Sequence, residues 1–170
     1  MERTMTEVKK HSVEVVTYHE RYRAAFKTLN LAWIEAYFVV EEADRTQLDD
    51  PVGQIVTPGG EVFFVLERGD VKGTCALIKK SDDVYELAKM AVNKSARGRG
   101  YSNRLMEAVI DGARKREASV LMLESNTILE PAIRLYRKYG FLVTPLDDHS
   151  EYGRANIRME LRLVDQPLSG

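Results

Sequence analysis

The fold is decided by one short stretch, Arg97-Gly98-Arg99-Gly100-Tyr101-Ser102. Residues 84–92 before it are mostly apolar and predict a strand, while residues 101–117 after it place apolar side chains on one helical face. A glycine-rich turn from a strand into a helix leaves the N–H groups of the first helical turn without partners inside the helix. Because glycine allows close approach and the helix dipole favours negative charge, this turn predicts an anion site.

The kind of anion follows from the spacing of the glycines. A Walker A loop needs GxxxxGK[ST], which is absent, and the Rossmann pattern GxGxxG needs glycine where Asn103 stands. A dinucleotide fold also begins with alternating strands and helices, whereas the strands before this loop read as antiparallel neighbours. Arg97, Arg99 and Lys94 add positive charge that suits a pyrophosphate. A basic helix start without a ligand is the remaining alternative.

The residues before the loop predict two helices and an antiparallel meander of strands. One apolar stripe marks the first helix, with residues three or four apart: Tyr22, Phe26, Leu29, Trp33 and Tyr37. The expected strands are 13–18, 62–66, 71–78 and 84–92, and the expected helices are 19–38 and 41–49.

The residues after the loop predict two further helices and three strands. The helix over 101–117 carries its apolar side chains on one face: Leu105, Met106, Val109, Ile110 and Ala113. A second helix begins at Pro131 and ends at Gly140, since proline favours the first turn of a helix and glycine the position after its end. The expected strands are 119–123, 141–144 and 156–163.

Four segments in this order resemble the GCN5-related N-acetyltransferase (GNAT) family across residues 62–144. They are Tyr85-Glu86-Leu87-Ala88-Lys89-Met90-Ala91-Val92, Arg97-Gly98-Arg99-Gly100, Leu123-Glu124-Ser125-Asn126 and Ala132-Ile133-x-Leu135-Tyr136-x-x-Tyr139-Gly140-Phe141. The resemblance implies an α+β fold, with a mostly antiparallel sheet of six to seven strands, splayed middle strands and about four flanking helices. Ser102 departs from the family's (Q/R)xxGx(G/A) loop, but it is small and its hydroxyl can donate to a phosphate oxygen.

The resemblance also implies that acetyl-CoA is the co-substrate and a primary amine of a small molecule or peptide the acceptor. Main-chain groups of the strand ending in Met90-Ala91-Val92 would receive the pantetheine arm, and the loop would hold the pyrophosphate. Asn126 resembles an asparagine that contacts CoA, although a turn or capping role is the alternative. The expected cofactor-binding residues are Met90, Ala91, Val92, Arg97, Gly98, Arg99, Gly100, Tyr101, Ser102 and Asn126.

Acetyl transfer to an amine needs a group that removes a proton, because an alkylamine has a pKa of about 10.4 in water. Glu86 resembles in position the family's glutamate base, and Glu124 on the next strand is the second candidate. Tyr136 falls on the family's Leu-Tyr pair, near the CoA sulfur. Its pKa of about 10 exceeds that of a thiol, about 8.5, so a hydrogen bond to the departing thiolate is favoured over full proton donation.

The acceptor is expected to lie outside the CoA-binding core. Trp33 and Tyr37 lie near acidic residues at the end of the first helix, where aromatic and acidic groups suit a cationic amine. Their alternative role is in the core of the helical stripe. Arg154 could hold an acceptor carboxylate.

Composition sets the remaining expectations. The 170 residues suit one domain over 1–170, and 25 basic against 26 acidic residues make nucleic acid an unlikely partner. The sequence has no apolar run of about 20 residues and no signal segment, so we expect a cytoplasmic protein without a membrane partner, as monomer or homodimer. Cys75 reads as a packed thiol, and the three scattered histidines disfavour a metal site. Two alternatives to an acetyltransferase are a non-catalytic acyl-CoA-binding regulatory module and a phosphotransfer enzyme.

Overall fold

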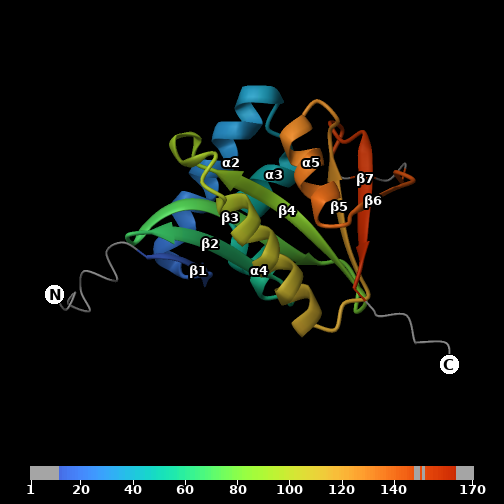
Figure 1. Ribbon diagram of the computed structural model, residues 1–170, viewed down its shortest axis with the longest axis horizontal. Helices are drawn as coiled ribbons and strands as arrows, with labels where there is room; N and C mark the ends of the chain where they lie inside the picture. The colour runs from blue at the N-terminus through green and yellow to red at the C-terminus, as the bar shows by residue number, and fades with distance from the viewer. Residues whose placement is uncertain (1–11, 148–149, 151, 164–170) are drawn as a thin grey trace.

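The computed structural model describes residues 12–147, 150 and 152–163. In that part of the chain, seven strands form one sheet in the order β1-β2-β3-β4-β5-β7-β6 (Figure 1). Every neighbouring pair is antiparallel except β4 and β5. The strands are β1 (Val13–Thr17), β2 (Glu61–Glu67), β3 (Asp70–Lys79), β4 (Val84–Val92), β5 (Val120–Ser125), β6 (Leu142–Thr144) and β7 (Ile157–Arg162). The α+β fold with a mostly antiparallel sheet is confirmed.

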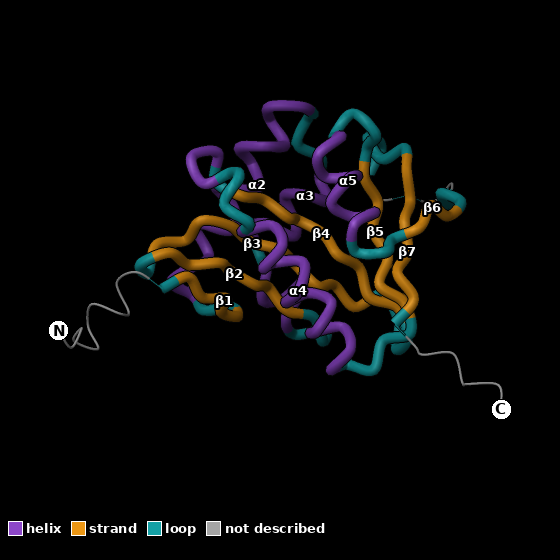
Figure 2. The backbone as a smooth tube through the Cα atoms, viewed as in Figure 1, coloured by secondary structure: helices purple, strands orange, loops and turns teal. Residues whose placement is uncertain are grey.

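Helices cover both faces of the sheet (Figure 2). The α-helices of the described residues are α2 (Arg23–Tyr37), α3 (Glu42–Asp49), α4 (Tyr101–Lys115) and α5 (Glu130–Lys138). Phe26 and Ile34 of α2 and Leu48 of α3 pack on one face. Leu105 of α4 and Tyr136 of α5 pack on the other. One buried cluster therefore lies on each face of the sheet. None of the described helices is long and apolar enough to cross a membrane.

The central strands separate partway along their length. The parallel pairing of β4 with β5 spans three residue pairs and ends at Glu86↔Met122. Beyond that point β4 continues to Val92 along β3, whereas β5 continues to Ser125 along β7. The splayed middle strands expected from the family resemblance are therefore present.

A bulge interrupts β4 just past this divergence. Thr74 of β3 lies opposite Ala91, and Ala76 lies opposite Ala88, so Lys89 and Met90 together oppose the single residue Cys75. Lys89 has φ +54°, the left-handed conformation that residues with a Cβ rarely adopt. Periodicity predicts an unbroken strand over 84–92 and gives no sign of this bulge.

Two further details differ from the expectations. The residues of α2 that are buried are Phe26, Asn30 and Ile34, while Tyr37 is 53% exposed. The buried face of α2 is therefore rotated relative to the expected apolar stripe, and Tyr37 does not belong to the core. A short helix at Val52–Val56 was not predicted, and the three-residue helical turns at Glu20–Tyr22 and Lys94–Ala96 flank longer elements.

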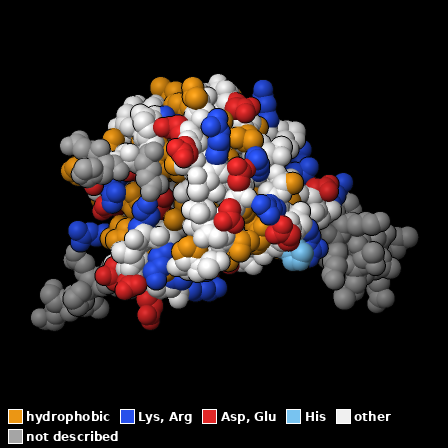
Figure 3. All heavy atoms as spheres, turned by 180° about the vertical axis from the view of Figure 1, so that it is seen from behind, with side chains coloured by type: hydrophobic (Ala, Val, Ile, Leu, Met, Phe, Trp, Pro, Cys, Tyr) orange, Lys and Arg blue, Asp and Glu red, His pale blue; other side chains and the backbone are white. Residues whose placement is uncertain are grey.

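Basic and acidic side chains are interspersed on the face seen from behind (Figure 3).

Candidate active site

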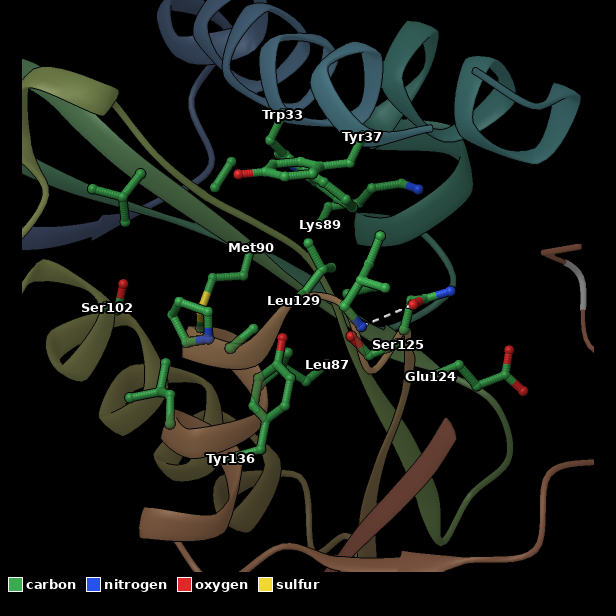
Figure 4. Close-up of a pocket in the computed structure, with 18 of the residues that line it drawn as sticks. Trp33, Tyr37, Leu87, Lys89, Met90, Ser102, Glu124, Ser125, Leu129 and Tyr136 are labelled. Atoms are coloured by element: carbon green, nitrogen blue, oxygen red, sulfur yellow. Dashed lines mark hydrogen bonds between the residues drawn. The ribbon is translucent and has the colours of Figure 1, made fainter. Parts of the chain in front are cut away.

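A cavity of about 520 Å³ opens where β4 and β5 diverge (Figure 4). Arg99 does not line it, because its guanidinium turns to Glu67 Oε2 at 3.1 Å. The other expected site residues all lie on the wall of this one cavity: Trp33, Tyr37, Glu86, Met90, Ala91, Val92, Arg97, Gly98, Gly100, Tyr101, Ser102, Glu124, Asn126, Tyr136 and Arg154.

The glycine-rich turn forms one end of the cavity. Gly98 and Gly100 have φ +81° and +79°, conformations that favour glycine, and a Cβ built on either would meet open space. Gly100 is the N-cap of α4 and no side chain caps this helix. The N–H groups of the first turn of α4 are therefore available to an anion, as the sequence predicts.

The edge of β4 that faces β5 forms the middle of the wall. The opposite edge is bonded to β3, with Val92 paired to Gly73 and Ala91 to Thr74. Because the pairing with β5 has ended at Glu86, the main chain of the last part of β4 lies along the cavity instead of along a strand. A linear chain with amide groups can bond to such an edge as an added strand would.

Tyr136 of α5 is 8% exposed, and Figure 4 shows its hydroxyl directed into the cavity. Burial raises the pKa of Tyr136 above its ordinary value of 10.0, so at neutral pH it is a hydroxyl donor. Cys75 behind it is fully buried, as expected for a packed thiol, and its Sγ donates to the carbonyl oxygen of Ala88 at 3.5 Å. Burial raises the pKa of the Cys75 thiol as well, which keeps it neutral.

The two candidate carboxylates differ in their surroundings. Glu86 is 5% exposed and belongs to the last pair before β4 and β5 separate. Glu124 of β5 accepts a hydrogen bond of 2.6 Å from Ser150 Oγ. Figure 4 shows the Glu124 carboxylate turned away from the centre of the cavity. Glu86 is therefore the carboxylate buried at the narrow end of the splay.

Aromatic side chains form the end of the cavity opposite the glycine-rich turn. Trp33 and Tyr37 project from the last turns of α2 (Figure 4). The Arg154 guanidinium lies 5.8 Å from the Trp33 ring centroid and 4.7 Å from that of Tyr152. Both expected aromatic residues thus line this end, together with Phe38.

A buried charged cluster stands behind these rings. Asp44, which is fully buried, accepts two hydrogen bonds of 2.7 Å from Arg154 and one of 2.5 Å from Lys89 Nζ. Lys89 Nζ also donates to Tyr152 Oη at 3.2 Å, and Glu41 accepts a bond of 3.2 Å from Arg154. The guanidinium of Arg154 is thus already paired with two carboxylates of the protein, and its expected role toward an acceptor carboxylate stays a prediction.

The cluster shifts the pKa values of its members. Burial alone would raise the pKa of Asp44, but its bonds to Arg154 and Lys89 outweigh burial and hold that pKa well below its ordinary value. Burial lowers the pKa of Lys89, against the opposing effect of Asp44.

Among the residues that the structure describes, no three His, Cys, Asp or Glu side chains come together as a metal site would require.

Asn126 lines the cavity but uses its side chain within the protein. Its Nδ2 donates to the Arg154 carbonyl oxygen at 2.8 Å, and its Oδ1 accepts from Ile128 N at 3.0 Å. These contacts are the turn and capping role that the sequence leaves as an alternative. Contact with CoA stays a prediction.

Sequence reasoning missed Lys89 and Asp44. One signal was available for Lys89: a single charged residue inside the otherwise apolar segment Leu87-Ala88-Lys89-Met90-Ala91-Val92. A charge buried in a strand needs a partner. Asp44 is 45 positions away, and nothing in the local pattern identifies it as that partner.

The chain matches known proteins over most of its length. The model of the Acetyltransferase (GNAT) family matches residues 22–141. An IAA acetyltransferase from Azospirillum brasilense is 38% identical over 81 residues, which cover 46% of this chain and 53% of that protein. Human N-acetyltransferase 8B is 27% identical over 132 residues, 74% of this chain and 55% of that protein. The chain spans between 35% and 55% of the length of the curated relatives it matches.

Solved structures share the fold at low sequence identity. A GNAT-family acetyltransferase from Staphylococcus aureus Mu50 has a TM-score of 0.81 and 17% identity, covering 90% of this chain and 100% of that one. YncA from Salmonella typhimurium, solved with its cofactor acetyl-CoA, has a TM-score of 0.74 and 20% identity, covering 92% and 97%. With the family match over residues 22–141 and the splayed sheet, the chain belongs to the GNAT family of acetyltransferases.

Proposed function

We propose that this chain transfers an acetyl group from acetyl-CoA to a primary amine of a small molecule or peptide, by direct attack in a ternary complex. One observation carries the proposal: a single cavity joins the uncapped N-terminus of α4 to Glu86, Tyr136 and the aromatic end. Relatives named N-acetyltransferase 8B and N-acetylaspartate synthetase support nitrogen as the acceptor atom. Balanced charge, 25 basic against 26 acidic residues, disfavours nucleic acid as partner. A cytoplasmic location, the monomeric or homodimeric state and the extent of the domain remain predictions.

The residues present fit acetyl-CoA, which would supply an activated acetyl thioester. The open space above Gly98 and Gly100 and the free first turn of α4 suit its pyrophosphate, with Arg97 close by. The cavity edge of β4 from Met90 to Val92 suits the amides of the pantetheine arm. Binding at both places would direct the reactive end of the co-substrate toward Tyr136 and the base.

The chain's own groups would then move one proton and stabilise one charge. Glu86, buried at the narrow end of the splay, is the better candidate to take a proton from the acceptor ammonium, directly or through water. Glu124 is the weaker candidate because its carboxylate is bonded to Ser150. The raised pKa of Tyr136 makes proton donation by Tyr136 still more unfavourable, so we assign it a hydrogen bond to the departing sulfur.

A thiol-release assay tests the proposal. The protein would be incubated with acetyl-CoA and a panel of small amines, amino acids and peptides with free N-termini. Release of CoA that depends on one class of amine, with mass spectrometry of an acetylated product, is the expected result. Tight CoA binding by calorimetry without turnover on any amine would instead favour the non-catalytic acyl-CoA-binding module.

Tyr136→Phe should lower kcat by about 10- to 100-fold, because it removes one hydrogen bond worth about 1.5–3 kcal/mol to a charged group. The phenyl ring keeps the packing against Phe141, whose ring centroid lies 6.0 Å away. CoA affinity should therefore change less than threefold by calorimetry. Unchanged kcat in the folded variant would remove Tyr136 from the reaction.

Glu86→Gln should lower kcat by about 10²- to 10⁴-fold, the usual contribution of a general base. The matched change Glu124→Gln should cost less than about tenfold, since that carboxylate is turned away from the cavity centre. A larger loss in Glu124→Gln than in Glu86→Gln would reverse the assignment.

A further inference from the structure

The bulge in β4 places a lysine, Lys89, in a backbone conformation that is unusual for a residue with a Cβ. Three non-glycine residues have positive φ in the described part of the chain: Arg68, Lys89 and Glu117. Arg68 lies in the turn between β2 and β3 and Glu117 in the connection after α4, whereas Lys89 alone lies inside a strand. A residue with a Cβ persists in this conformation only where its surroundings enforce it.

The side chain of Lys89 is held by buried partners. Its Nζ lies 2.5 Å from Asp44 Oδ1 and 3.2 Å from Tyr152 Oη, and 4.6 Å from the centroid of the Tyr152 ring. The side chain is 3% exposed, and that of Asp44 is 0% exposed. A buried ammonium bonded to two residues, Asp44 and Tyr152, has little freedom to move, and this limits the main chain that carries it.

Asp44, which holds the Lys89 ammonium, is itself held by residues of several elements. Asp44 lies in the first turn of α3, where its Oδ2 accepts from the backbone N–H of Glu41 in a capping box. Arg154, from the connection before β7, holds the same carboxylate through two further bonds. Tyr152 donates its hydroxyl to Gln47 of α3 at 3.0 Å. Lys89 is therefore bonded to α3 through Asp44 and to the segment before β7 through Tyr152, and these two partners are themselves held by Arg154 and Gln47.

The bulge lies between Glu86 and the last residues of β4, so its geometry affects the wall of the cavity. Glu86 lies three residues before Lys89, and Met90 follows Lys89 immediately; all three line the cavity. The bulge adds one residue to β4, so Ala88 and Lys89 both face the α2–α3 side, where Ala88 packs and Lys89 meets Asp44. Without the extra residue, every side chain on one flank of the bulge would change face.

We propose that Lys89 is a positioning residue whose bond to Asp44 holds the β4 bulge and so sets Glu86 and the Met90–Val92 edge in register along the cavity. The inference rests on the proposed acetyltransferase function for its kinetic consequence. Its structural content, that the Lys89 side chain enforces the bulge, can be tested without turnover.

The decisive variants are Lys89→Gly and Lys89→Ala. Both leave Asp44 with the same remaining partners, so the loss of the ammonium is common to the two. Glycine adopts positive φ without a steric penalty, whereas alanine does not. Lys89→Gly should keep the bulge in a crystal structure, and Lys89→Ala should lose it, with residue 89 at negative φ. We expect kcat for Lys89→Ala to be about tenfold below that of Lys89→Gly, at similar acceptor KM.

The outcomes separate the possible roles of Lys89. A bulge retained in the Lys89→Ala crystal structure would overturn the proposal whether or not the wild-type protein turns over. Equal kcat in the two folded variants, with only melting temperatures differing, would mean a purely structural role and would also overturn it. An increase of acceptor KM by the same factor in both variants, at unchanged kcat, would assign Lys89 to acceptor binding instead. Absence of wild-type turnover would refute the proposed function and leave the crystal structures to decide this inference.

Discussion

Replacing Gly100 with valine is expected to weaken CoA binding at least 100-fold while the sheet remains folded. Gly100 is the N-cap of α4 with φ +79°, a conformation that costs a residue with a Cβ about 1–2 kcal/mol and a β-branched residue more. Valine would either hold this strain or turn the first amides of α4 away from the cavity. Loss of two hydrogen bonds to a charged group, at about 1.5–3 kcal/mol each, corresponds to at least 100-fold in affinity.

Gly69→Val is the matched control for that experiment. Gly69 has φ +81°, and a Cβ added there meets open space, as at Gly100. It lies in the turn between β2 and β3 and does not line the cavity. Both variants should lose similar stability in urea denaturation, but calorimetry should show a loss of CoA affinity in Gly100→Val alone. Wild-type affinity in folded Gly100→Val would remove the turn from the binding site.

The elements that periodicity specifies were predictable to within a few residues. The face of α4 is one example: Leu105, Met106 and Val109 are all fully buried, as their spacing requires. The turn before α4 was predictable because its chemistry is local, since two glycines and a helix start lie within five residues. Local pattern and local chemistry therefore recovered one end of the cavity directly from sequence.

The charged cluster behind the aromatic end depends on contacts between distant positions. Asp44 and Arg154 are 110 positions apart. Asp44 reads alone as an ordinary charged residue, and the sequence assigns Arg154 to an acceptor carboxylate instead of to Asp44. Arg99 shows the same limit, because its basic side chain suited the anion site but pairs with Glu67 from β2. Residues on both sides of Lys89 are apolar, so the break in alternation at the bulge cannot be seen in the sequence, and the register with β3 and the positive φ of Lys89 reveal it.

Asp44→Asn is expected to destabilise the protein by about 3–5 kcal/mol, because it leaves two buried cations without their shared carboxylate. The side chains of Lys89 and Arg154 are only 3% and 14% exposed, so water cannot replace Asp44. Asp49→Asn is the matched control. Asp49 also lies 2.5 Å from a lysine, Lys27, but those side chains are 54% and 49% exposed, and such pairs contribute about 0–1 kcal/mol. Urea denaturation at pH 7 measures both losses.

The pH dependence of the stability difference between the wild-type protein and Asp44→Asn tests whether the charge of Asp44 causes it. The folded-state pKa of Asp44 is lowered below that of the unfolded chain, about 3.9. Its contribution to stability is therefore fully present above pH 4 and is lost as the pH falls toward the folded-state pKa. The difference between the wild-type protein and Asp44→Asn should narrow by about 1 kcal/mol between pH 7 and pH 3, as the unfolded carboxylate becomes protonated. A difference no larger than that of Asp49→Asn at pH 7 would mean that solvent reaches the two cations and that Asp44 does not anchor the cluster.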